Sequence, residues 1–196
     1  MNAPALIGLD VAGDADSWRE AGFTVDADGG CRLGHVRMQT GVGAVGISKW
    51  ELGDAGSVEP AGHPNGSVLL DHLVVFSDDP DRTTAEYAEL GLEVRRVRDL
   101  GNGTTQTFFR AGEVIIELVG PIPGVGDQVR ADRFWGLSPV VADLEACARL
   151  LGDRMGAIKD ATQPGRQIAT LRHKACGLTI PIAFMSPEPG RSTVAH

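Results

Sequence analysis

An internal repeat is the feature that most limits how this chain of 196 residues can fold. The segments Trp18–Val25 (WREAGFTV) and Tyr87–Val94 (YAELGLEV) match, and each predicts the end of a helix, a glycine stop and the start of a strand. The segments 103–110 (GTTQTFFR) and 165–172 (GRQIATLR) match in length and at both ends. The repeat therefore predicts about three copies of one strand–helix–three-strand unit.

The predicted units are separated by segments rich in glycine and proline. The first unit covers 1–58, the second 67–121 and the third 133–186, followed by a flexible tail over 187–196. In the first unit we expect a helix near 15–21 and strands near 6–11, 23–26, 32–40 and 44–52. His63 lies between Gly62 and Pro64 in the first linker, where we expect a solvated loop residue.

His72 and Glu117, inside apolar strands of the second unit, each call for an explanation. His72 lies inside the run 69–76 (LLDHLVVF), and Glu117 lies inside 114–119 (VIIELV). A carboxylate inside an apolar strand is costly unless it is paired, hydrogen-bonded or bound to a metal. The simplest explanation is that His72 and Glu117 meet on one face of a sheet.

This pattern, with histidine on the first strand and glutamate on the last, resembles one module of the vicinal oxygen chelate superfamily, which includes glyoxalase I, bleomycin-resistance proteins and extradiol dioxygenases. The resemblance implies an α+β fold of repeated βαβββ modules, in which curled mixed sheets form a cupped cleft with the helices outside. It also implies that His72 and Glu117 are metal ligands, for one divalent ion such as Zn, Ni, Mn or Fe. The same scaffold serves many reactions, so the resemblance is weak evidence for any one of them.

The expected ligand set is incomplete. The third unit has Ser138 at the histidine position and Ile182 or Ala183 at the glutamate position, and the first has Gly8 and Ser48 or their neighbours. His173, His35 or Gln39 could complete the set if the fold brings them in. Without a metal, His72 and Glu117 would hydrogen-bond directly, either as a general base with its orienting partner or as a satisfied core pair.

Strand alternation predicts further residues of the cleft. Gln106, Phe108 and Arg110 share one face of their strand and are expected to contact a substrate. Trp135, Ser138 and Arg172 are the candidates from the third unit. Arg110 and Arg172 occupy equivalent positions, and together they would suit a carboxylate or phosphate.

Composition excludes several partners. The net charge is −8 and no long basic segment is present, which argues against nucleic acid, and no apolar run is long enough to span a bilayer. Three cysteines without a CxxC pair, and no evident signal peptide, favour a reducing cytoplasm. We expect the second and third units to enclose the cleft, and a homodimer. The first unit could extend the sheet, cover the cleft or pair with its copy.

The function predicted from the sequence is small-molecule chemistry of the lyase or isomerase type through His72 and Glu117, with or without a divalent metal. The alternative is a non-catalytic protein that sequesters a small molecule, as bleomycin-resistance proteins do. A purely structural dimer is a third reading. Dioxygenase chemistry is less favoured, because its second histidine would have to stand where Ser138 is.

Overall fold

The computed structural model describes residues 3–57, 59, 61–121 and 132–190, so the predicted tail beyond residue 190 lies outside the described residues. The first unit contains β1 (Ala5–Val11), α1 (Ala15–Glu20), β2 (Gly30–Leu33), β3 (Val36–Gln39) and β4 (Ile47–Gly53). The second contains β5 (Ser67–Phe76), α2 (Pro80–Glu89), β6 (Val94–Gly101), β7 (Thr104–Ala111) and β8 (Val114–Gly120). The third contains β9 (Arg133–Val141), α3 (Leu144–Leu151), η1 (Gly152–Arg154), β10 (Lys159–Asp160), β11 (Gln167–Thr170), η2 (His173–Cys176) and β12 (Ala183–Met185).

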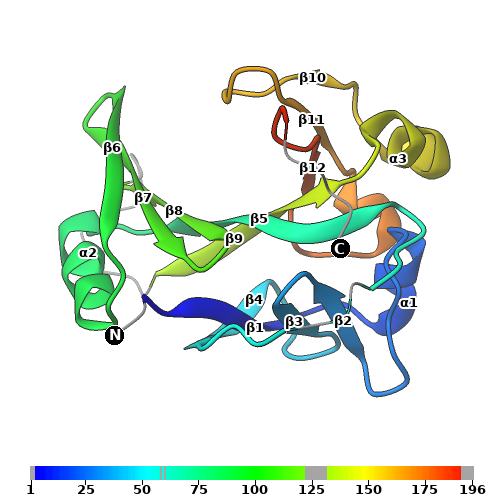
Figure 1. The fold of residues 1–196 in the computed structure, drawn as a ribbon, viewed down its shortest axis with the longest axis horizontal. Helices are drawn as coiled ribbons and strands as arrows, with labels where there is room; N and C mark the ends of the chain where they lie inside the picture. The colour runs from blue at the N-terminus through cyan, green and yellow to red at the C-terminus, as the bar shows by residue number, and fades with distance from the viewer. Residues whose placement is uncertain (1–2, 58, 60, 122–131, 191–196) are drawn as a thin grey trace.

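The second and third units together form one mixed sheet of eight strands, in the order β10-β11-β12-β9-β5-β8-β7-β6. In each of these two units the first strand pairs with the last in parallel, β5 with β8 and β9 with β12. The two first strands, β5 and β9, join the units as an antiparallel pair in which His72 lies opposite Ser138. In Figure 1 the two halves of this sheet rise as separate wings from the central strands, with α2 and α3 outside them. This arrangement confirms the predicted α+β fold of βαβββ modules around a cup.

The first unit departs from the prediction. The segment 23–26 is not a strand, and the expected strand 32–40 is a hairpin of β2 and β3 that turns at Gly34, where φ is 59°. Positive φ is readily adopted by glycine, so Gly34 was a signal of the turn. The last strand, β4, runs antiparallel to β1, and it is β3 that pairs with β1 in parallel.

This pairing corrects one expected equivalence. Glu117 lies two residues beyond Ile115, the partner of His72. In the first unit the partner of Gly8 is Arg37, and two residues further along is Gln39. Gln39 on β3, rather than Ser48 on β4, therefore corresponds to Glu117.

The first unit packs on the face of the large sheet that is turned away from the cup. The buried side chains of Leu70, Leu73 and Val75 on β5 belong to one hydrophobic core that also contains Trp18 and Met38 of the first unit. Phe23 stacks on Phe184 with ring centroids 5.9 Å apart, and Trp50 contacts Phe134 with centroids 5.5 Å apart. Figure 1 shows the four-stranded sheet β2-β3-β1-β4 beneath the central strands β5 and β9. The first unit therefore supports the floor of the cup from behind.

Each of the helices α1, α2 and α3 begins with an aspartate cap. Asp14, Asp79 and Asp143 cap α1, α2 and α3 by accepting a backbone N–H three residues on. None of the helices in the described ranges is long and apolar enough to cross a membrane.

His63 is not solvated, contrary to the expectation. Its side chain is buried because the linker folds back on the first unit, where the Thr24 N–H donates to Nδ1 at 2.9 Å and Nε2 lies 2.7 Å from the Arg32 carbonyl oxygen. These contacts place a proton on Nε2 and leave the ring neutral. Burial lowers the pKa of His63 from 6.5, against the opposing effects of the Arg32 carbonyl and Asp26.

Candidate functional site

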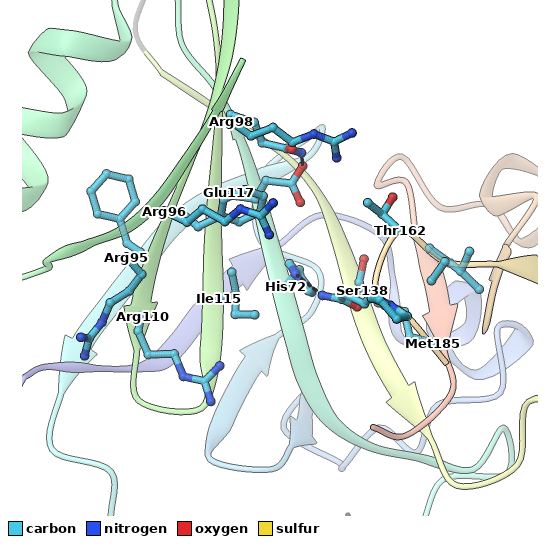
Figure 2. A pocket seen from close by; sticks show the side chains of 17 residues that line it. His72, Arg95, Arg96, Arg98, Arg110, Ile115, Glu117, Ser138, Thr162 and Met185 are labelled. Atoms are coloured by element: carbon cyan, nitrogen blue, oxygen red, sulfur yellow. Dashed lines mark hydrogen bonds between the residues drawn. The ribbon is translucent and has the colours of Figure 1, made fainter. Parts of the chain in front are cut away.

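A cavity of about 610 Å³ fills the cup between the second and third units. Its volume is in the range that accommodates a small organic molecule. Six of the predicted site residues line it: His72, Gln106, Phe108, Arg110, Glu117 and Ser138. Figure 2 shows His72 and Glu117 directed into the same space from neighbouring strands.

The register of the strands explains this convergence. On the face toward the cup, Arg110 pairs with Ile115, Ile115 with His72, and His72 with Ser138. One step along the sheet, Phe108 pairs with Glu117, which pairs with Val74. The intervening residue Phe109 is 1% exposed and packs edge-on against Tyr87 of α2. Alternation thus separates the lining residues of β7 from its core residue.

A β-bulge adds a residue that alternation misses. The pairing of β5 with β9 moves from Leu70↔Pro139 to His72↔Ser138, which leaves Asp71 as an extra residue. Asp71 therefore shares the cup side with His72, and its Oδ2 lies 2.7 Å from His72 Nδ1. The two atoms are close but poorly aligned for a hydrogen bond. The contact brings a carboxylate against one nitrogen of the imidazole.

Arg166, which is 3% exposed, holds this pair in place. Its Nη1 donates to Asp71 Oδ2 at 2.9 Å and to Gln163 Oε1 at 3.1 Å, and its Nε donates to the Ser186 carbonyl at 2.9 Å. Because the Gln163 oxygen faces Arg166, its amide nitrogen faces His72, with 3.4 Å between Gln163 Nε2 and His72 Nε2. A donor at that position requires a lone pair on Nε2, which puts the ring proton on Nδ1 beside Asp71.

The charge on Asp71 follows from the same contacts. Burial alone would raise its pKa, but the contact with the His72 ring and then the ion pair with Arg166 act against it, and the net effect lowers the pKa below 3.8. Asp71 is therefore ionised at neutral pH, although its side chain is buried.

Glu117 takes a different partner from the predicted one. Gln106 Nε2 donates to Glu117 Oε1, and the other amide atom, Gln106 Oε1, is buried without a hydrogen-bond partner. No hydrogen bond joins His72 to Glu117 among the described residues, so the predicted direct bond is wrong. The carboxylate that does contact the imidazole is that of Asp71.

These donors fit a divalent ion only in part. His72 Nε2, the Glu117 carboxylate and the orphaned Gln106 Oε1 all border the cavity, and Asp71 supports His72 as carboxylates support metal-bound histidines. Within the described ranges, however, no group of three or more histidine, cysteine, aspartate or glutamate residues could hold a metal. None of the three extra donors considered from the sequence lines the cavity: His173 lies in η2, His35 is 3.7 Å from Glu113, and Gln39 donates to the Asp28 carbonyl.

Two predicted substrate-contacting residues lie elsewhere. Trp135 is not among the lining residues and packs against Phe76, with ring centroids 5.1 Å apart. Arg172 stands at the N-cap position of η2 without a capping side-chain hydrogen bond, is not among the lining residues, and its backbone N–H donates to the Arg154 carbonyl at 2.7 Å. The predicted convergence of Arg110 and Arg172 on the cavity is therefore not seen. The arginines that join Arg110 in lining it are Arg95, Arg96 and Arg98 of β6.

Sequence reasoning missed Asp71, Gln163 and Arg166. The pair Asp71-His72 inside an apolar run was a usable signal, because two consecutive polar residues cannot both leave the core of a regular strand. Nothing local marks Gln163 and Arg166, which lie more than 90 residues from the histidine they support.

Comparison with known proteins agrees at the level of the fold. The alignment with methylmalonyl-CoA epimerase from Mycobacterium tuberculosis covers 63% of this chain and 91% of the epimerase chain, with 21% sequence identity and a TM-score of 0.50. The alignment with a 2,2',3-trihydroxybiphenyl 1,2-dioxygenase from Sphingomonas wittichii covers 95% of this chain and 91% of the dioxygenase chain, with 14% sequence identity and a TM-score of 0.56. No family model and no curated protein sequence matches. The chain thus shares the fold of these two enzymes, as expected from the sequence.

Proposed function

We propose that this chain is an enzyme of the lyase or isomerase type that moves a proton at a carbon next to a carbonyl group, with His72 as the general base. The observation that carries the proposal is the orientation of the imidazole. Nδ1 faces the ionised Asp71, and Nε2, whose lone pair faces Gln163 Nε2 at 3.4 Å, belongs to a ring that lines the cavity. A neighbouring carboxylate stabilises the imidazolium that forms when the base takes a proton.

The proton transfer can be followed atom by atom. His72 Nε2 takes the proton as the C–H bond breaks, and the electron pair moves onto the carbonyl oxygen as an enolate. Gln163 Nε2 and the hydroxyl of Ser138 are donors that border the same cavity. Return of the proton to the other face, or to another atom, completes an isomerisation, and loss of a leaving group completes a lyase reaction.

Glu117 has one of two roles in this scheme. His72 and Glu117 would hold a divalent ion, which would supply a Lewis acid for the carbonyl. His72 Nε2 would then be a ligand and not the base. Without an ion, His72 is the base and Glu117, fixed by Gln106, is a second acid–base group.

Hydrogen exchange tests the proposal without knowledge of the natural substrate. The protein would be incubated in D₂O with a panel of 2-oxo acids, aldehydes and thioesters, and deuterium uptake beside the carbonyl followed by NMR. We expect uptake in the wild-type protein and a loss of about 10²–10⁴-fold in His72→Ala. Equal uptake in the two proteins would refute the role of His72.

A non-catalytic binder is the second candidate. The incomplete set of metal donors and the apolar part of the lining, with Phe108, Ile115, Ile168 and Met185, favour it. Panel compounds that raise the unfolding temperature without any deuterium uptake would support this candidate.

Metal analysis of the purified protein separates the metal-dependent and the metal-free version of the proposed enzyme. The expected homodimer and cytoplasmic location stay predictions, and sedimentation would test the first.

A further inference from the structure

One wall of the cavity carries unpaired positive charge. Arg96 and Arg98 of β6 and Arg110 of β7, together called the arginine wall, all line the cavity. Among the described residues none of the three has an ion-pair partner within 4.0 Å, whereas their neighbour Arg95 lies 3.9 Å from Glu93. An acidic protein has many carboxylates that could pair with them, so their lack of partners is informative.

The charge of the cavity is opposite to that of the chain. Four arginines and one glutamate line the cavity, while the whole chain has a net charge of −8. In Figure 2, Arg96 and Arg98 extend toward Glu117 and the open space, and Arg95 turns away. A concave wall of one charge sign attracts ligands of the opposite sign.

The strand register sets the distance from this wall to the candidate base. Arg96 pairs with Phe108, Phe108 with Glu117, and Glu117 with Val74 of β5, the strand that carries His72. Three strand spacings of about 4.8 Å separate β6 from β5, or roughly 14 Å along the sheet before its curl and the reach of the arginines shorten the gap. A ligand that touches both Arg96 and His72 is therefore elongated, with its charged end several bonds from the reacting carbon.

The opposite wall has no ionised side chain among its lining residues. It consists of Ala161, Thr162, Gln163, Pro164, Ile168 and Met185 of the third unit. The two walls thus suit different parts of one molecule, and they fix the direction in which it binds.

We propose that the arginine wall binds a terminal oxyanion, a carboxylate or a phosphate, of an elongated small molecule whose uncharged body lies against the third unit. This proposal names the substrate class of the proposed enzyme. It rests on the proposed function only for the reacting end of the ligand, and binding of the charged end is independent of that function. Guanidinium groups donate paired hydrogen bonds to both kinds of oxyanion, so the wall sets the charge of the ligand. The distance from the wall to His72 sets the length of the ligand.

Binding of three probes with the same alkyl chain tests the wall. Hexanoate, hexyl phosphate and uncharged hexanol would be titrated by calorimetry at constant ionic strength. We expect at least one anion to bind roughly tenfold or more tightly than hexanol to the wild-type protein, and the double variant Arg96→Gln/Arg98→Gln to lose that preference. The tighter of the two anions identifies the oxyanion. Arg149→Gln on α3, which removes an exposed charge that is not part of the cavity lining, should leave the preference unchanged.

Two results would overturn the proposal: hexanol binding as tightly as both anions, or Arg96→Gln/Arg98→Gln losing no more preference than Arg149→Gln. If the glutamine pair lowers stability, Arg96→Lys/Arg98→Lys keeps both charges, and we expect it to retain only part of the preference. The measurement involves no turnover. Selective anion binding without any deuterium uptake would therefore uphold the wall and reject the proton-transfer function.

Discussion

The first and second units contain the same pair of parallel strands, and the pair in the second unit forms the floor of the 610 Å³ cavity. In the second unit β5 and β8 present His72 and Glu117 to the cup, and in the first unit β1 and β3 present Gly8 and Gln39 at the matching positions. The third unit rises opposite β8 and closes the cup. None of the described residues that line the cavity belongs to the first unit. A parallel strand pair therefore provides a floor, and a second unit is needed to make a site.

The second and first units also differ in how far an arginine–aspartate ion pair is exposed to water. Asp71 and Arg166 form an ion pair whose side chains are 8% and 2% exposed. Arg37 and Asp28 form an ion pair of similar length, with side chains 34% and 68% exposed. The chemistry is identical, but water screens one pair and is excluded from the other. Substitutions should expose that difference, and the largest effect is expected at Arg166.

Replacing Arg166 by methionine leaves Asp71 as a buried carboxylate without its arginine partner. We expect a loss of about 3–5 kcal/mol in the free energy of unfolding, measured by urea denaturation. The matched change Arg37→Met in the first unit should cost no more than about 1 kcal/mol. Equal losses in the two variants would show that the buried network carries no special stability.

The second largest effect is expected in the pH dependence of stability, which should distinguish the buried Asp71 from the exposed Asp28. Its pKa in the folded protein lies below 3.8, so the stabilisation it provides is complete at neutral pH and is lost as the pH falls through that lowered pKa. Asp71→Asn removes a titrating group, and we expect a flatter loss of stability in acid than in the wild type. Asp28→Asn should change the acid limb less, because Asp28 is exposed to solvent. A D71N profile parallel to the wild type would contradict the assignment.

The smallest of these effects is expected at His63, which fastens the linker between the two units. Its pKa in the folded protein lies below the ordinary 6.5, so the unfolded chain binds its proton first as the pH drops. Stability should therefore decrease below pH 6.5 until the lowered pKa is reached. His63→Gln should remove this slope and cost about 1–2 kcal/mol at neutral pH. Thermal unfolding between pH 5 and 8 measures both, and an unchanged slope would argue against the buried neutral ring.

The sequence predicted what depends on period and repetition. Alternation along β7 placed Gln106, Phe108 and Arg110 on the side that lines the cavity, and the repeat led to the modular fold. The positions of His72 and Glu117 on one face followed from two polar residues in apolar strands. These features are local, so a single sequence contains them.

The rest depends on contacts that local patterns do not encode. The partner of His72 was missed because the bulge at Asp71 breaks the two-residue period. Arg172 and Trp135 were misplaced because η2 and the contact with Phe76 turn them from the cavity. His63 was misjudged because a linker of glycine and proline gives no sign that its histidine will find Thr24 and Arg32.

The bulge in β5 has a consequence for the side chains of that strand. A regular strand gives every second side chain to the protein interior, so neighbouring residues cannot both serve chemistry. One inserted residue lets Asp71 and His72 stand together while Leu70 and Leu73 stay in the core on either side. One inserted residue thus adds a carboxylate beside the imidazole, and without it Leu70, His72 and Leu73 would follow the alternation of a regular strand.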